Sequence, residues 1–129
     1  MQMVKTTNLD APQKDILVKP ELAFRLTCQI GNTGVVNNAD GRKIIPAGTP
    51  VGVKGKNVLE ERTAVLVVSN TSADGANAQG ILMNDTDVTD GNNSAPVIFS
   101  GIIDLTKCPT IDATAKTALA PHIIFIKGV

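Results

Sequence analysis

Few residues of this 129-residue chain could carry out chemistry, and they are scattered along the sequence. His122 is the single histidine. It stands between Pro121 and an apolar run, with no Ser, Cys or Asp at a recognisable motif spacing. We therefore interpret it as a structural histidine at the start of a strand. Cys28 and Cys108 form no Cys-x-x-Cys pair, and no second histidine completes a zinc set. We expect two buried free thiols rather than a disulfide, no catalytic residue and no cofactor.

The acidic stretch Asp85-Thr86-Asp87, followed by Asp90-Gly91, resembles the start of a calcium-binding loop, which gathers several oxygen ligands on a tight backbone. Such a loop also needs a glutamate at its twelfth position, and Pro96 occupies that position here. We interpret the stretch as a solvated hairpin tip and predict no metal site. The glycines at 31–34 and 48–50 lack the Gly-Lys-Ser/Thr ending of a phosphate-binding loop, which indicates turns.

Composition argues against several classes of partner. The chain has 12 basic and 12 acidic residues with the signs interspersed, and it has no Trp or Tyr. A nucleic-acid surface needs a basic stripe or aromatic stacking platforms, so we expect no nucleic-acid partner. No apolar run approaches the roughly 18 residues that span a bilayer, and the N-terminus has no secretory pattern. We expect no membrane partner either.

The stretch from Gly80 to Leu105 organises the predicted fold. Two apolar runs bracket the turn residues Asp90-Gly91-Asn92-Asn93, which is the pattern of a strand, a loop and a second strand. Gly101 interrupts the second run, where we expect a bulge or a close approach of another backbone. The rest of the chain should pack around this hairpin.

The flanking segments predict further short elements. Alternation over 22–30 predicts a half-buried strand whose core-facing residues are Leu22, Phe24, Leu26, Cys28 and Ile30. The β-branched run 64–69 predicts a strand covered on both faces. Residues 112–120 predict a short helix that ends before Pro121, and 122–127 predict a buried final strand.

Together these elements predict a mainly β domain, barrel-like or ribbon-like, with one short helix near the C-terminus. Residues 1–20 are polar and contain Pro12 and Pro20, and alone they cannot bury enough apolar area to become ordered. We therefore predict a flexible N-terminal arm at 1–20 and a single β-rich domain at 21–129.

The order of motifs in the second half resembles a known family. Gly80-Ile81-Leu82 is followed by a hydrophilic turn, by Val97 to Gly101, by an Asp- and Ala-rich helix and by an isoleucine-rich last strand. The segment Ile45-Pro46-Ala47-Gly48-Thr49-Pro50-Val51-Gly52 precedes them. Over residues 42–129 this order resembles the head decoration proteins of tailed bacteriophages, typified by the phage lambda head protein D. Residues 22–36 depart from the family by lengthening the front of the domain.

The resemblance implies a β-clip, a bent two-stranded ribbon or small incomplete barrel, in which Gly80, Ile81, Leu82 and Gly101 are structural positions. It implies a homotrimer that binds the major capsid protein at three-fold sites of an expanded head and reinforces that head. Such a protein lies on the outer surface of the virion capsid, and in the host cytoplasm during assembly. The N-terminal arm would bind the capsid, and the β-forming residues Ile16-Leu17-Val18 could add a strand to a capsid edge. This role needs no enzyme activity and no small-molecule substrate.

Two alternatives remain open. One is an enzyme on a β-clip scaffold, such as a nucleotide hydrolase, which needs a metal-holding acid, phosphate contacts and an aromatic ring to stack the base. Asp85 and Asp87 are the acids to test for it. The other is a surface adhesion or carbohydrate-binding module, which usually stacks sugars on aromatic rings that this chain lacks.

Overall fold

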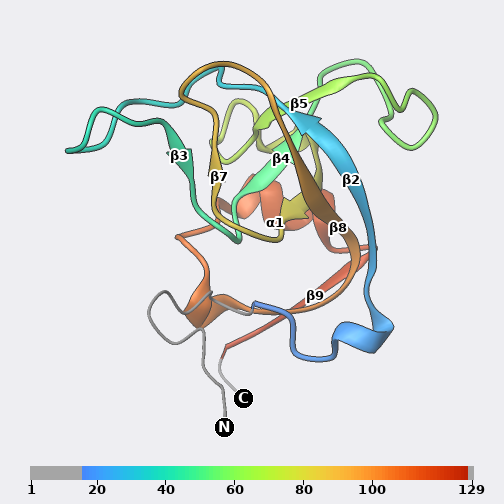
Figure 1. Cartoon of the computed structure of the whole chain (residues 1–129). Helices are drawn as coiled ribbons and strands as arrows, with labels where there is room; N and C mark the ends of the chain where they lie inside the picture. Colours follow the sequence, from blue (N-terminus) through green and yellow to red (C-terminus); the bar gives the residue numbers. More distant parts are fainter. Residues whose placement is uncertain (1–15, 128–129) are drawn as a thin grey trace, which may run out of the picture.

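Strand β8 (Asn93–Asp104) is the longest element of residues 16–127, the part of the chain that this computed structural model describes (Figure 1). Its first part pairs antiparallel with β2 (Phe24–Ile30) along one edge and with β6 (Ala78–Leu82) along the other. Its last part pairs in parallel with β9 (Ile123–Ile126). The hairpin predicted from Gly80 onward is thus confirmed as β6 and β8.

The main sheet closes into a ring. Strands β4 (Pro50–Gly52) and β5 (Val65–Val68) complete the order β2-β5-β4-β6-β8, and β2 pairs back to β8. The predicted mainly β, barrel-like fold is confirmed, and the barrel is closed where the sequence predicted an incomplete one. The closing strand is β2, which lies in the segment that the family resemblance does not cover. Outside the ring, β3 (Ile44–Ile45) and β7 (Thr86–Asp87) form a separate two-stranded sheet.

A β-bulge lies in the middle of β8. Phe24 pairs with Ser100 while Arg25 pairs with Ile98, so Phe99 is an extra residue on β8. Gly101 follows with a φ of 148°, a backbone conformation that side chains disfavour. The interruption predicted near Gly101 is confirmed. Because the bulge shifts the alternation by one residue, Ile98 and Ile103 enter the same core although five positions separate them.

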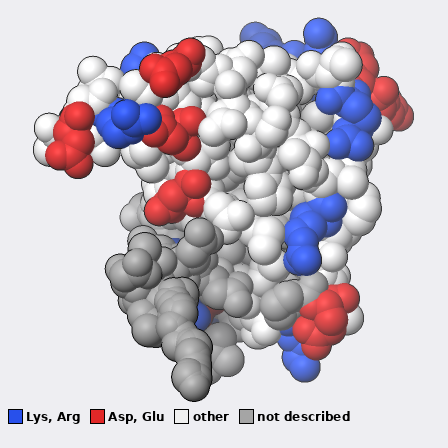
Figure 2. All heavy atoms as spheres, in the orientation of Figure 1, with Lys and Arg blue, Asp and Glu red and all other residues white. Residues whose placement is uncertain are grey.

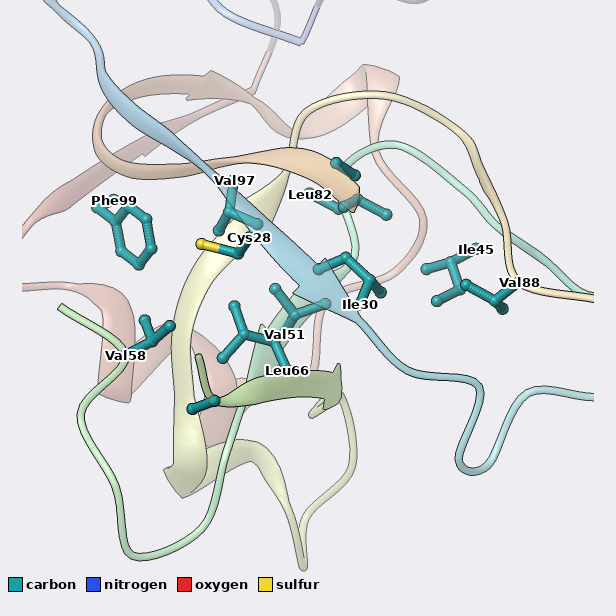
Figure 3. Packing of buried hydrophobic residues seen from close by; sticks show 12 residues of the cluster. Cys28, Ile30, Ile45, Val51, Val58, Leu66, Leu82, Val88, Val97 and Phe99 are labelled. Atoms are coloured by element: carbon teal, nitrogen blue, oxygen red, sulfur yellow. The ribbon is translucent and has the colours of Figure 1, made fainter. Parts of the chain in front are cut away.

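The buried apolar residues form two cores on opposite faces of the sheet. The first core fills the barrel, and Figure 3 shows that it extends from Phe99 and Val58 at one end to Ile45 and Val88 at the other. The second core lies between the outer face of β6, β8 and β9 and the helix α1 (Ala113–Leu119). Its fully buried members are Ile16, Ala47, Ile81, Ile98, Ile103, Ala115, Leu119 and Ile123.

The short helix confirms its predicted position. The Asp112 carboxylate accepts a hydrogen bond from the Thr114 backbone nitrogen at 2.9 Å and caps the helix. Three 3-10 turns, at Pro20–Leu22 (η1), Gly75–Asn77 (η2) and Leu105–Lys107 (η3), connect the remaining elements. Turn η2 packs closely on α1, since a Cβ placed on Gly75 would lie 2.7 Å from the Ala115 nitrogen.

Three burial predictions for the strands are wrong. Leu22 and Phe24 were expected to face the core, but they are 62% and 48% exposed. Leu22 lies in η1, outside β2, and Phe24 lies at the end of the barrel, where the inner face of the strand meets solvent. The last strand is not buried as a whole, because Ile124 is 60% exposed on the outermost strand of the sheet.

Residues 16–18 pack along β8. Leu17 forms a bridge with Ile103, the Val18 nitrogen donates to the Ile102 oxygen at 3.0 Å, and the Asp104 nitrogen donates to the Ile16 oxygen at 2.9 Å. The packed part of the chain therefore begins before the boundary predicted at residue 20. Residues 1–15 of the predicted arm, and residues 128–129, lie outside the described residues.

Candidate functional site

The two ends of the barrel differ. At one end, Ile45 of β3 and Val88 after β7 close the core and are fully buried. At the other end Phe99 meets Phe24, with ring centroids 6.2 Å apart and planes at 46°. Leu59 is also 47% exposed there, beside Phe99 in the lining of a hollow of about 320 Å³. We name Phe24, Leu59, Phe99 and this hollow the barrel-mouth patch.

A glutamine fixes the loop that carries Leu59. The side-chain oxygen of Gln79 accepts a hydrogen bond from the Val58 nitrogen at 2.9 Å. Its side-chain nitrogen donates to the Val53 oxygen at 2.9 Å and to the Lys56 oxygen at 2.7 Å. These hydrogen bonds hold the loop against β6 and place the Val58 side chain in the barrel core. Sequence reasoning missed this clamp, whose only signal is a lone amide residue inside an apolar strand.

His122 lines the same hollow but has no partner for catalysis there. The other lining residues are Lys56, Asn57, Leu59, Ala78, Gln79, Phe99, Ala118 and Leu119. This lining contains no carboxylate, hydroxyl or thiol that could act with an imidazole. The His122 backbone nitrogen donates to the Leu119 oxygen at 3.0 Å, and its oxygen accepts from the Gly101 nitrogen at 3.3 Å. The histidine joins the end of α1 to the start of β9, as a structural residue would.

The acidic stretch is tied into the fold. The Asp87 carboxylate accepts hydrogen bonds from the Thr89 hydroxyl and backbone nitrogen and from the Arg42 guanidinium. The bonds from Thr89, with that from Arg42, lower the pKa of Asp87 to about 2. Asp85 accepts from the Ala47 nitrogen at 2.7 Å. The hydrogen bonds of these carboxylates stabilise the region of β3 and β7. Within residues 16–127, no group of three or more His, Cys, Asp or Glu residues could hold a metal ion.

Cys28 and Cys108 do not form a disulfide with each other. Cys28 is buried inside the barrel, and this burial raises the pKa of its thiol, although the nearby Arg62 opposes the shift. Cys108 is only half-buried, contrary to the prediction of two buried thiols, and its Sγ donates to the Asp104 oxygen at 3.4 Å. The burial of Cys28 is unlike the accessible, electropositive environment of an activated nucleophile.

Three of the residues that carry the resemblance, Gly80, Ile81 and Leu82, are closely packed. A Cβ added to Gly80 would lie 2.5 Å from a Val97 methyl and 2.8 Å from the Ile98 oxygen, so β6 and β8 approach closely only with glycine there. Ile81 is buried in the second core and Leu82 in the first. The close approach explains the need for the glycine in physical terms.

Charge is distributed around the edges of the face shown in Figure 2. Lys, Arg, Asp and Glu lie near the rim of the described surface in that view, and its central part is uncharged. Exposed large apolar side chains are Leu22, Phe24, Val36, Leu59 and Ile124. Exposed apolar side chains that gather in one place mark contact sites in soluble proteins.

In residues 16–127, no helix is long and apolar enough to cross a membrane. The comparisons with known proteins found neither a family model nor a curated protein that matches this chain.

Proposed function

We propose that this chain is a capsid decoration protein, which binds as a homotrimer to the major capsid protein at three-fold sites of an expanded phage head and reinforces it. The observation that carries the proposal is the barrel-mouth patch, where the half-exposed Leu59 lines a hollow and the half-exposed Phe24 contacts Phe99 of the same lining. Such a patch suits contact with another protein surface, and we propose that it forms the contact between the copies of the trimer. The resemblance of residues 42–129 to head decoration proteins supports the same role, on the outer surface of the virion.

The architecture suits a mechanical task. A closed ring of strands leaves no strand of the barrel itself unpaired, and two cores back the same sheet. Pulling two strands of the ring apart must break a row of backbone hydrogen bonds at once. We propose that the trimer bridges neighbouring capsid subunits, so that outward pressure on the head must also separate its contacts.

The proposed capsid-binding role of the arm needs adjustment to the packing at its end. Ile16 and Leu17 are 1% and 6% exposed in the second core. In this state they anchor the arm on β8 and cannot at the same time add a strand to a capsid edge. We therefore propose that the fifteen preceding residues make the first capsid contact, and that Ile16, Leu17 and Val18 contribute if the capsid displaces them from β8. Three arms on one trimer would act together, so weak individual contacts could hold firmly.

Light scattering on the purified full-length chain tests the proposal. We expect a particle of three times the chain mass at micromolar concentration. Deletion of residues 1–15 should leave this mass unchanged and weaken binding to expanded shells assembled from the cognate major capsid protein. A monomer at all concentrations would contradict the trimer, and undiminished shell binding after the deletion would contradict the arm mechanism.

A further inference from the structure

We propose that the contact between copies extends from the barrel-mouth patch across the face of β8 and β9 that carries Ile124, that it covers His122, and that protonation of His122 therefore weakens the trimer. The inference rests on the proposed function, because it takes the barrel-mouth patch as the place where copies meet. It adds the extent of that contact and the group that regulates it.

The barrel-mouth patch alone is small for a stable contact. The exposed halves of Phe24 and Leu59 together offer about 200 Å² of apolar surface. A stable interface between proteins covers about 800 Å² on each partner. The contact between copies must therefore continue onto the surface beside the patch.

The strand register shows where uncharged surface continues. Phe24 of β2 is paired with Ser100 of β8, and Ile102 follows Ser100 by two residues along the same strand. A Cβ placed on Gly101, between these two, would lie 3.5 Å from a Leu17 methyl in the second core. Since side chains alternate along a strand, Ser100 and Ile102 point away from the second core and share the face on which Phe24 lies.

This face continues onto β9. Ile102 is paired with Ile124 across the two parallel strands. Ile123 is 2% exposed in the second core, so Ile124 points to the opposite face and is 60% exposed there. A row of uncharged side chains thus extends from the barrel mouth to the outermost strand of the main sheet.

His122 lies between the hollow and Ile124. Its side of the hollow is shared with Leu59 and Phe99, and its backbone oxygen accepts from the Gly101 nitrogen at 3.3 Å. Ile124 follows it by two residues on β9. His122 is itself exposed in the single chain. A second copy that covers both the hollow and Ile124 must therefore also cover the imidazole.

The surroundings of His122 disfavour its charged form once water is removed. The other charged residue in the lining of the hollow is Lys56, whose ammonium lies 3.9 Å from the exposed carboxylate of Glu61. The lining residues from β6, β8 and α1 carry no charge, and they are Ala78, Gln79, Phe99, Ala118 and Leu119. A covered imidazolium would find no carboxylate in this lining and would be repelled by Lys56. Because linkage is reciprocal, protonation of His122 must weaken the contact that covers it.

Sedimentation equilibrium of the full-length chain at pH 7.5 and pH 5.5, at equal ionic strength, tests the inference. Histidine changes its charge between about pH 5 and 8, and His122 is the single histidine of the chain. We expect the concentration at which half of the chains are in trimers to be at least about tenfold higher at pH 5.5. His122→Gln, which is neutral at both pH values, should associate equally at both. His122→Lys, which is charged at both, should associate weakly at both.

A matched pair of variants tests the extent of the contact at pH 7.5. Ile124→Ser removes exposed apolar surface and should raise the half-association concentration by about fivefold or more. Val36→Ser, at a loop position that is 81% exposed, should leave it unchanged. Urea unfolding at both pH values shows whether each variant is folded. If Ile124→Ser does not fold, the two His122 variants decide alone.

Three results would overturn this inference while the trimer stands. They are equal association of the unsubstituted chain at both pH values, a pH dependence that persists in His122→Gln, and unchanged association of folded Ile124→Ser. A chain that is monomeric at both pH values would instead contradict the proposed trimer, and the inference would fail with it. The two failures are therefore distinguishable.

Discussion

Replacement of Phe24 by serine tests the barrel-mouth patch as a contact between copies. A phenylalanine side chain can bury about 200 Å², and Phe24 is 48% exposed in the single chain. About 100 Å² therefore remains for a neighbouring copy to cover, which at about 25 cal/mol per Å² contributes about 2.5 kcal/mol to each contact. The loss of this contribution corresponds to about a 60-fold weaker contact, since each 1.4 kcal/mol is about tenfold.

The effect on the fold itself should be moderate. Phe24→Ser also removes the buried half of the side chain and the contact with Phe99, for a loss of about 2–3 kcal/mol of unfolding free energy. Leu59→Ser changes the same patch without touching the ring pair, and it should weaken the trimer in the same direction. Val36→Ser, at a loop position far more exposed than either, should change stability by no more than about 0.5 kcal/mol.

Sedimentation equilibrium over a range of concentrations measures the association, and urea unfolding measures the fold in parallel. We expect the unsubstituted chain and Val36→Ser to form the trimer, and the two patch variants to dissociate at concentrations where the trimer otherwise persists. If Phe24→Ser and Leu59→Ser are folded and associate as tightly as the unsubstituted chain, the patch is not the contact between copies.

Three further predictions concern the packing and the titratable groups. Gly80→Ala should lower the free energy of unfolding by about 1–3 kcal/mol in urea titrations, because its Cβ would press on β8. The pKa of Asp87 is lowered from 3.8 to about 2, so its ionised carboxylate stabilises the fold above about pH 4, and this contribution is lost as the pH falls toward 2. Asp87→Asn should therefore reduce the dependence of the melting temperature on pH between about 4 and 2. Cys28 should react with a thiol reagent only on unfolding, because burial raises its pKa and blocks access, whereas the half-buried Cys108 should react in the folded chain.

Each of these three predictions could be contradicted by a specific result. An unchanged urea midpoint for Gly80→Ala would mean that β6 and β8 are not as closely packed as described. An Asp87 carboxyl that titrates near pH 4 by NMR would show that its bonds to Thr89 and Arg42 do not persist in solution. Equal reaction rates of the two thiols in the folded protein would place Cys28 outside the barrel core.

Local patterns predicted the elements whose causes are local. The turn residues at 90–93 and the apolar runs beside them were sufficient for the β6–β8 hairpin, and Asp112 followed by spaced alanines was sufficient for α1. The interruption near Gly101 also follows from residue type, since its φ of 148° is a conformation that glycine readily adopts, whereas the close approach at Gly80 was not predicted from the residues. The hairpin, the helix and the interruption could be read without knowledge of distant partners.

Features that depend on distant pairing were not predictable in this way. Phe24 and Ser100 are paired across most of the chain, and this pairing is what closes the barrel. Alternation in 22–30 predicts that Phe24 faces the core, but it cannot tell where the barrel ends and solvent begins. The same limit explains why the exposure of Ile124 was not predicted, because the sequence of an apolar strand is similar at the centre and at the edge of a sheet. The Gln79 clamp likewise needs the loop at 53–58 to be placed first.

Binding to expanded shells assembled from the cognate major capsid protein tests the central claim most directly. The purified chain should co-sediment with these shells to a saturating level and raise the temperature at which they rupture. The unexpanded form of the same shells should bind far less. Shells that bind no chain, or that rupture at the same temperature with the chain bound, would contradict the proposal that this protein binds and reinforces the expanded head.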